Sequence, residues 1–498
     1  MPFWLFTTFA CLYLLTSGGH FYASDDVQKY LALDAWWRTG RVFFPEGWTE
    51  GVGGQRCAWF PLGASVFMLP GYLVGHAVGS VLPWLKVDYV ARFCIALQNA
   101  VVSGALVALV AVFARRLGYE AKSVLFAAAA LGLGTMVWPY AKTAWSEPAA
   151  TCALFAACYL LYRASEERLA RPGLLLGAGA CLAAAVSIRL VLAVVAPGAL
   201  AWLVYRHRGE PARLGKALGL VALPLAGAVA AALWYNLARY GHVTSLENYR
   251  LVQGAVVLPP GGRPAWTLSN LWHYSFNPAD GLFWFAPATL LGLVGARRFA
   301  QAHPALAGML ACALGPLLGF YVGAWGLSDW AWGQRYAYVF QPFLLLPAAT
   351  LWQQRPTRQA LWLGIGGLGL LVQLVAVPQN FNYLYERNRA AHPNQSIQQL
   401  MADPDHGPLV LAAEALPATL AGAVRALATP RPNGPLPVEQ YRERAQSVPD
   451  MWPWLQLLTP LPRAAIALVV TLLLALLAFS LDRLAAACRR DAPAAPAP

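Results

Sequence analysis

Charged residues are scarce in this sequence. Only 12% of its 498 residues are Asp, Glu, Lys or Arg, whereas 58% are hydrophobic, and a soluble globular domain carries about 25% charged residues. Apolar runs of about 17 to 25 residues, the length that crosses a hydrocarbon core, recur from one end of the chain to the other. The composition argues against a series of soluble domains and predicts an all-α polytopic membrane protein.

A disulfide framework is also missing. Six of the eight cysteines lie inside apolar runs, and no Cys/His spacing predicts a metal site. The formal net charge of +13 raises the question of nucleic-acid binding, but the basic residues form short clusters between apolar runs, as membrane topology requires. We therefore expect membrane lipids, and no nucleic acid, among the partners.

The basic clusters predict the orientation of the chain, because the positive-inside rule places them in the cytoplasm. They are Arg115, Arg116 and Lys122; Arg163, Arg168 and Arg171; Arg206, Arg208, Arg213 and Lys216; Arg297 and Arg298; Arg355 and Arg358; and Arg483, Arg489 and Arg490. Between them we predict about twelve transmembrane helices, at residues 3–19, 93–113, 123–141, 148–163, 173–187, 190–205, 217–237, 281–296, 305–324, 337–352, 360–378 and 463–482. Both ends of the chain then lie inside.

The apolar run Phe60 to Leu82 is left over. A crossing there would move every later basic cluster to the other side of the membrane, and the prolines Pro61, Pro70 and Pro83 suit a broken segment. We expect an interfacial or re-entrant segment inside a first outer loop of residues 20–92. The alternative is an ordinary span with an imperfect positive-inside pattern.

Three regions follow from this topology. Residues 1–378 form the transmembrane core, and residues 463–498 form the last span and a cytoplasmic tail. Residues 379–462 form a small outer domain rich in proline, which we expect to be mostly irregular with short helices such as Ser396 to Met401.

Ionisable side chains collect at the outer rim of the predicted bundle. Asp25 and Asp26 follow the first span, Glu147 precedes Pro148, and Arg189 interrupts an apolar stretch. Further along the rim are Tyr249, Arg250, Arg335 and Tyr336.

Each of these residues also has a structural interpretation. The acids could favour helix starts, near Val27 and at the fourth span, and Arg335 could anchor the interface beside neighbouring tryptophans. Arg189 is harder to explain in this way, because an unpaired arginine inside a membrane costs several kcal/mol.

Taken together, the rim residues suit one reaction. Two neighbouring carboxylates in a poorly solvated site cannot both ionise freely, so one gains a raised pKa and becomes a general base. Arginine supplies permanently charged donors to phosphate oxygens. These groups are the minimum needed to move a sugar from a lipid phosphate to a hydroxyl.

Ordered motifs over roughly residues 1–350 carry a family resemblance. They are Asp25-Asp26-Val27-Gln28-Lys29-Tyr30, Trp59-Phe60-Pro61-Leu62-Gly63, Arg115-Arg116-Leu117-Gly118, Trp145-Ser146-Glu147-Pro148, Trp234-Tyr235-Asn236 and Gly333-Gln334-Arg335-Tyr336. This set resembles the GT-C superfamily of glycosyltransferases that use polyprenyl-phosphate sugars, such as protein O-mannosyltransferases and lipid A aminoarabinose transferases. The resemblance implies a catalytic aspartate in the first loop, by position Asp25, followed by juxtamembrane helices. The lysine that the family carries near the proline turn is absent, and Arg56 is the nearest substitute.

The prediction is an inverting hexosyl- or pentosyltransferase of the cell inner membrane, with its site facing the periplasm. Asp25 and Asp26 form the catalytic pair, and Arg335, Arg56 and Arg189 bind the donor phosphate. Glu147, Tyr30, Tyr249 and Tyr336 contact the acceptor or the sugar, which is carried by a polyprenyl phosphate; the acceptor is a lipid, glycan or protein. The chemistry requires no cofactor, although Asp25, Asp26 and Glu147 offer ligands for a divalent ion.

Two alternatives remain open. A transporter or flippase of a lipid-linked or anionic substrate would tend to show internal repeats and a midplane site, and no repeat is detectable. An oligosaccharide polymerase or ligase would rely on arginines and histidines of the outer loops, such as His242 and His273.

Overall fold

The computed structural model is almost entirely helical. It describes residues 1–82, 85–243, 268–324 and 331–395 and, with short gaps, 399–490. Within that part there is one two-stranded hairpin, β1 (Thr49–Glu50) against β2 (Arg56–Cys57). Tyr249 and most of the helix predicted at Ser396 to Met401 lie outside the described residues.

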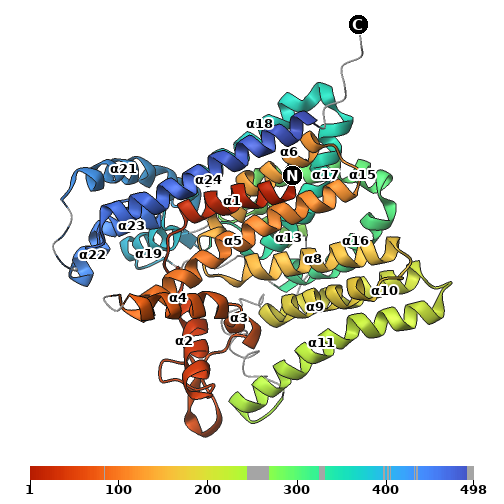
Figure 1. Cartoon of the computed structure of the whole chain (residues 1–498), viewed down its shortest axis with the longest axis horizontal. Helices are drawn as coiled ribbons and strands as arrows, with labels where there is room; N and C mark the ends of the chain where they lie inside the picture. The colour runs from red at the N-terminus through yellow and green to blue at the C-terminus, as the bar shows by residue number, and fades with distance from the viewer. Residues whose placement is uncertain are drawn as a thin grey trace.

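Helices occupy each stretch predicted as a span, and most of the long ones run roughly parallel or antiparallel (Figure 1). They are α1 (Pro2–Thr16), α5 (Val87–Arg116), α6 (Ala121–Gly134), α7 (Val137–Ala141), α8 (Ser146–Glu166), α9 (Pro172–Ile188), η2 (Leu190–Val194), α10 (Val195–Arg206), α11 (Pro211–Tyr240), α14 (Leu282–Phe285), η3 (Pro287–Thr289), α15 (Leu290–Ala302), α16 (Pro304–Ala324), η4 (Arg335–Phe340), α17 (Gln341–Gln354), η5 (Pro356–Arg358), α18 (Gln359–Ala376) and α24 (Arg463–Arg490). In the described residues, seven helices are long and apolar enough to cross a membrane, and four shorter helices are also apolar. The prediction of an all-α polytopic membrane protein is confirmed.

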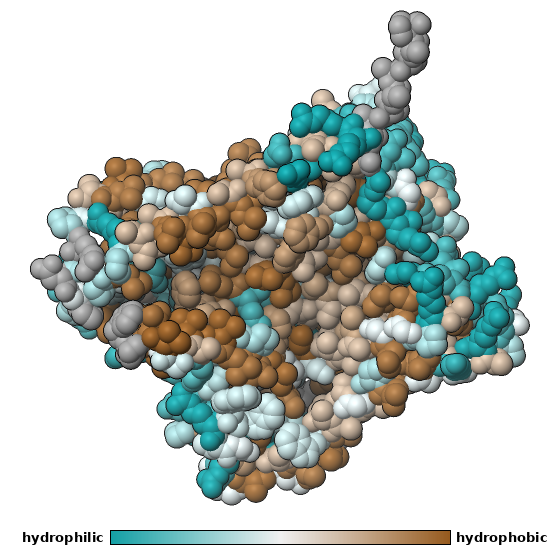
Figure 2. Space-filling view, in the orientation of Figure 1, coloured by the Kyte–Doolittle hydropathy of each residue, from teal (hydrophilic) through white to brown (hydrophobic). Residues whose placement is uncertain are grey.

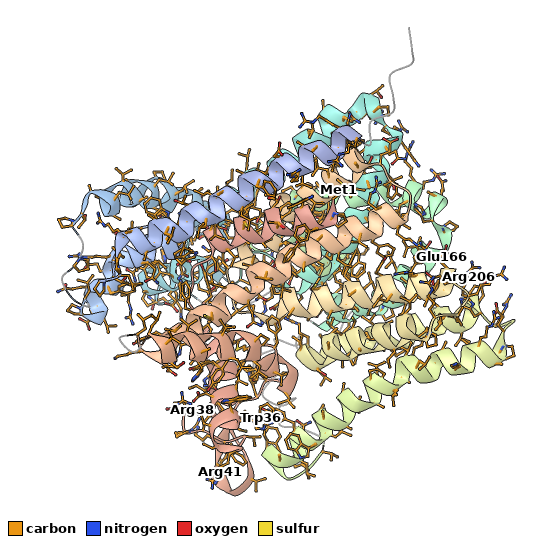
Figure 3. The ribbon with its side chains drawn as sticks, viewed as in Figure 1. Met1, Trp36, Arg38, Arg41, Glu166 and Arg206 are labelled. Atoms are coloured by element: carbon orange, nitrogen blue, oxygen red, sulfur yellow. The ribbon has the colours of Figure 1, made fainter. Side chains whose placement is uncertain are left out.

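The basic clusters share one end of the bundle. Glu167 at the end of α8 pairs with Arg116 of the first cluster at 3.9 Å and with Arg163 of the second at 3.1 Å. Figure 3 places Glu166 and Arg206 together at this same end. In Figure 2 hydrophilic surface gathers at this right-hand end and at the lower left, and hydrophobic surface lies between. This distribution agrees with the topology predicted from the positive-inside rule.

The leftover run folds as two helices, α3 (Leu62–Val66) and α4 (Leu69–Val81). Together they are long and apolar enough to cross a membrane. However, α4 packs on the first part of α5, where a Cβ on Gly75 would lie 2.3 Å from Ala91 Cα. Helix α1 packs further along α5, with Gly104 close to Ala10. Helix α4 therefore lies beyond the outer end of α1, in agreement with a broken juxtamembrane segment.

The outer region 379–462 is more helical than predicted. It contains α19 (Phe381–Ala391), α21 (Pro408–Ala428), α22 (Val438–Ala445) and α23 (Trp452–Gln456). The expectation of a mostly irregular region is wrong for α21, which has 21 residues and is long and apolar enough to cross a membrane. Proline in the first turn loses no hydrogen bond, and the run that follows is rich in the strong helix formers Ala and Leu.

The position of α4 leads to a labelling prediction. Lys86 stands just before α5 and Arg116 ends it, so a cysteine at Lys86 should react with an impermeant reagent from outside the cell. A cysteine at Arg116 should react only from the cytoplasm. The measurement uses whole cells and inverted vesicles in a background without the native cysteines. Reaction of the cysteine at Lys86 only from the cytoplasm would contradict the juxtamembrane placement of α4.

Candidate active site

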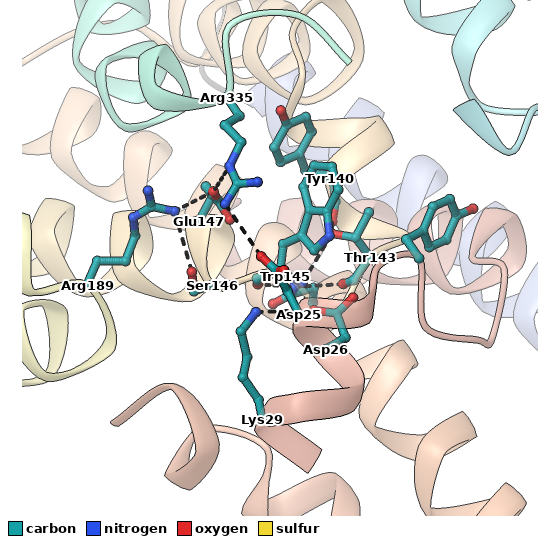
Figure 4. Close-up of polar contacts among 12 residues, drawn as sticks. Asp25, Asp26, Lys29, Tyr140, Thr143, Trp145, Ser146, Glu147, Arg189 and Arg335 are labelled. Carbon is teal, nitrogen blue, oxygen red and sulfur yellow. Dashed lines mark hydrogen bonds and ion pairs between the residues drawn. The ribbon is translucent and has the colours of Figure 1, made fainter. Parts of the chain in front are cut away.

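The two adjacent aspartates lie in the first turn of α2 (Ser24–Thr39), so the helix begins at Ser24 and not near Val27. Acidic side chains are favoured there because the N-terminal end of a helix carries a partial positive charge. Successive residues of an α-helix point about 100° apart. Asp25 and Asp26 therefore face different neighbours, as Figure 4 shows.

Asp26 is buried and paired with Lys29, one turn further along α2. The Nζ of Lys29 donates to Asp26 Oδ1 at 3.2 Å, and both side chains are at most 5% exposed. The ammonium also lies 5.1 Å from the ring centre of Phe60 in the Trp-Phe-Pro turn. The pKa of Asp26 is raised to about 6, because burial and the nearby charge of Asp25 together outweigh the lowering by Lys29.

Glu147 lies in the first turn of α8, after a turn held by Asn99 of α5. The amide of Asn99 donates to the carbonyls of Thr143 and Trp145 at 2.7 and 2.8 Å. The carboxylate of Glu147 is only 4% exposed. Because of this burial it needs charged partners close by, and two arginines supply them.

Arg189 is the first of these partners. It has an extended backbone between α9 and η2, and its Nη1 pairs with Glu147 Oε1 and donates to Ser146 Oγ at 3.4 Å. The end of α9 is itself fixed by the proline turn, since a Cβ on Gly63 would lie 2.4 Å from the carbonyl carbon of Ser187. The arginine that interrupts the apolar stretch is therefore paired.

Arg335 is the second partner. Its Nε donates to Glu147 Oε1 at 3.0 Å, and its Nη2 lies 3.9 Å from Asp25 Oδ2. Gly333, two residues earlier, has a φ of +72°, and a Cβ there would lie 2.5 Å from Phe285 Cβ. Only glycine fits this turn without strain, so Gly333 helps to aim Arg335 at the two acids.

A pocket opens beside the paired charges. Its lining residues are Glu147, Ala150, Thr151, Arg189, Leu192, Tyr321, Arg335, Tyr336 and Val339. The ring centre of Tyr336 lies 5.6 Å from the guanidinium carbon of Arg189 and 5.5 Å from that of Arg335, within cation–π range. Asp25 is 25% exposed and Arg335 is 21% exposed, so both can meet a ligand.

The structure thus brings together five of the predicted site residues: Asp25, Asp26, Glu147, Arg189 and Arg335, with Tyr336 completing the pocket wall. Two others lie elsewhere. The Nε of Arg56 donates to the Gly47 carbonyl at 2.6 Å, and the hydroxyl of Tyr30 donates to Asp88 Oδ1 at 2.5 Å, on the α5 side of α2.

Sequence reasoning missed Lys29, Thr151 and Tyr321. The spacing of Lys29 three residues after Asp26 was a usable signal, since residues i and i+3 are neighbours on a helix. Thr151 and Tyr321 carried no comparable signal because they lie within predicted apolar spans.

The three acids do not form a ligand set. Among the described residues no group of three or more His, Cys, Asp or Glu side chains is placed to hold a metal ion. Glu147 is engaged by two guanidiniums and Asp26 by an ammonium.

Comparisons with known proteins give no matching family model and no matching curated protein. Two solved structures are similar. The archaeal oligosaccharyltransferase AglB from Archaeoglobus fulgidus, in complex with an inhibitory peptide and a dolichol-phosphate, is 12% identical with a TM-score of 0.45, and the alignment covers 92% of this chain and 59% of AglB. ArnT from Cupriavidus metallidurans, bound to undecaprenyl phosphate, is 14% identical with a TM-score of 0.45, and the coverage is 92% and 84%.

Removing the charge of Glu147 should destabilise the protein. In Glu147→Gln two poorly exposed guanidiniums lose their shared counter-ion, and breaking a buried ion pair costs about 3–5 kcal/mol. We expect the Tm of the purified protein in detergent to fall by about 5 to 10 °C. Glu46→Gln is the matched control, since Glu46 is exposed, and equal Tm values for both variants would contradict the shared-counter-ion role.

The raised pKa of Asp26 gives a pH-dependent prediction. Because this pKa is about 6 in the folded protein and near 3.9 when unfolded, the folded state binds the proton more tightly. Protonation between these values favours folding. The Tm of wild type relative to Asp26→Asn should therefore rise as the pH falls from about 7.5 to about 5. If the Tm difference between wild type and Asp26→Asn stays constant or falls as the pH falls, the raised pKa of the Asp26 carboxyl is contradicted.

Proposed function

We propose that the protein is a membrane glycosyltransferase that moves a sugar from a polyprenyl-phosphate donor to an acceptor hydroxyl, with inversion. The observation that carries this proposal is the meeting of two arginines on one buried glutamate, with a partly exposed aspartate 3.9 Å from the second arginine. The three groups come from α2, the α9–η2 junction and the start of η4, far apart in the sequence.

The guanidiniums of Arg335 and Arg189 are the proposed binding site for the donor phosphate. Guanidiniums give charge-assisted hydrogen bonds to phosphate oxygens. In a poorly solvated site, fixed donors of this kind stabilise the negative charge that grows on the phosphate as the bond to the sugar breaks. Glu147 holds both guanidiniums in place before the donor arrives.

Asp25 is the proposed general base, because it is the exposed member of the acidic pair. Its carboxylate takes the proton of the acceptor hydroxyl, and the acceptor oxygen forms a bond to the anomeric carbon. The bond between that carbon and the phosphate oxygen breaks on the opposite face, and its electron pair leaves with the polyprenyl phosphate. Asp26, sealed against Lys29, positions the first turn of α2.

The side chains beside the two arginines include types that bind sugars. Tyr336 stacks on Tyr321 with 5.3 Å between ring centres, and Thr151 adds a hydroxyl. Hydroxyl and aromatic groups of this kind supply hydrogen bonds and apolar contact to a hexose or a pentose. The reaction as proposed uses the arginines for charge stabilisation and requires no cofactor.

The site lies at the end of the bundle opposite the basic clusters. With those clusters in the cytoplasm, the pocket opens toward the outer face of the membrane. We place the protein in the inner membrane with the site facing the periplasm, where a lipid, glycan or protein acceptor is within reach.

Asp25→Asn should abolish most of the activity. Removing a general base costs about 10²–10⁴-fold in rate, and the amide keeps the size of the side chain. The assay follows release of polyprenyl phosphate from several polyprenyl-phosphate sugars by purified protein, so that cleavage is distinguished from transport of the intact lipid.

Asp34→Asn is the matched control, because Asp34 lies on the same helix but accepts hydrogen bonds from Arg38 and Tyr72, which are not site residues. We expect this variant to keep most of the wild-type rate. Full activity of Asp25→Asn would rule out Asp25 as the base. If the wild-type protein moves the intact polyprenyl-phosphate sugar across the membrane without cleaving it, a flippase is favoured.

A further inference from the structure

A second cluster of buried charge lies in the described part of the outer region, centred on Asp450. Its Oδ1 contacts His20 Nε2 at 2.7 Å, and its Oδ2 accepts from Lys142 Nζ at 3.2 Å and from the hydroxyl of Tyr22. The side chains of Asp450 and Lys142 are 8% and 1% exposed. Nothing in the proposed reaction uses these groups, so their burial needs another explanation.

The contacts of His20 favour its doubly protonated form. Its Nδ1 lies 3.0 Å from the Phe21 carbonyl and its Nε2 faces the carboxylate of Asp450, and both of these partners are acceptors. Burial lowers the pKa of His20, but the charge of Asp450 and the hydrogen bonds raise it to a net value above the ordinary one. Asp450 therefore meets two cations and one hydroxyl, which compensate its burial.

Two of these partners, Tyr22 and Lys142, are close in the sequence to acids of the candidate active site. Tyr22 lies three residues before Asp25, and Lys142 lies five residues before Glu147. The backbone of Asp450 is itself fixed, since its N–H donates to the Pro378 carbonyl at 2.8 Å. One carboxylate from the outer region thus connects the segment before α2 with the turn before α8.

Neighbouring contacts extend the same arrangement. Asn382 of α19 donates to the Tyr22 carbonyl at 2.8 Å. Tyr385 of the same helix donates to the Ala331 carbonyl at 2.7 Å, four residues before Arg335. The outer region therefore bonds to each of the three segments that present Asp25, Glu147 and Arg335.

We infer that Asp450 is a positioning residue for the transfer reaction, and that region 379–462 is a frame that sets the separation between the base and the phosphate-binding arginines. This inference rests on the proposed function. A displacement of about 1 Å between reacting groups can cost about 10²-fold in rate. The segments that carry Asp25, Glu147 and Arg335 are not continuous in the chain, so other contacts must fix the distances between them. If region 379–462 only covered the site, it would not need a buried carboxylate between the segment before α2 and the turn before α8.

The first test measures structure without relying on activity. Asp450→Asn removes the charge that Lys142 and His20 share, so amide hydrogen exchange should become faster in residues 18–30 and 141–150, by about tenfold or more. Asp403→Asn is the matched control, because Asp403 also contacts a histidine of the outer region, His406, but is 32% exposed. Unchanged exchange in Asp450→Asn would overturn the inference even if the proposed function is correct.

The second test measures turnover. Rates are divided by the amount of polyprenyl phosphate bound at saturation, so that only folded sites are counted. Asp450→Asn should lose about tenfold or more in rate per site, while Asp403→Asn keeps the wild-type rate. Faster exchange with an unchanged rate per site would show a merely structural role and overturn the inference.

A milder variant covers the case in which Asp450→Asn does not fold. Tyr22→Phe removes one hydroxyl from Asp450 and should give a smaller change of the same kind in exchange and in rate per site. Unchanged values in Tyr22→Phe would then overturn the inference. Failure of wild type to bind or cleave any polyprenyl-phosphate sugar refutes the proposed function, and the exchange measurement still decides whether Asp450 holds the segments.

Discussion

The arrangement of the candidate active site depends on one buried carboxylate shared by two arginines. Glu147 is nearly inaccessible, and Arg189 and Arg335 both pair with its Oε1. A lone charge in such surroundings would cost many kcal/mol, so each of the three groups requires the others. Electrostatics consequently holds together the α9–η2 junction, the first turn of α8 and the start of η4. Hydrophobic packing alone would not specify which polar groups meet there.

The same principle explains the contrast between the two adjacent aspartates. Helical geometry turns Asp26 inward, where Lys29 neutralises it, and leaves Asp25 partly exposed and facing Arg335. Burial gives Asp26 the raised pKa, while accessibility gives Asp25 the position from which an acceptor can be reached. A general base needs a raised pKa and access to the acceptor, and here Asp26 has the first and Asp25 the second. We assign the base to Asp25 because a base must touch the proton that it removes.

A second network of buried charge supports the first. Asp450 neutralises Lys142 and His20 and adds the hydroxyl of Tyr22, so the outer region is bonded to the segments that carry the site. Glycines at close backbone contacts also help to fix the segments that carry the site. Gly63 lets the proline turn pack on the end of α9, and Gly333 allows the turn that aims Arg335. Backbone contacts and ion pairs together fix a site whose parts come from distant segments.

The sequence by itself predicted the fold class, the helical stretches and the grouping of the basic clusters, because hydrophobicity and basic loops act locally and leave a direct record in composition. It also identified Asp25, Glu147, Arg189 and Arg335 as site candidates, since charges near apolar spans are costly enough to stand out. Only the tertiary structure decided that Arg56 and Tyr30 lie away from them and that Asp450 contacts the segments next to the site. Those outcomes depend on which helices become neighbours, and pairing between residues hundreds of positions apart leaves no mark in a single sequence.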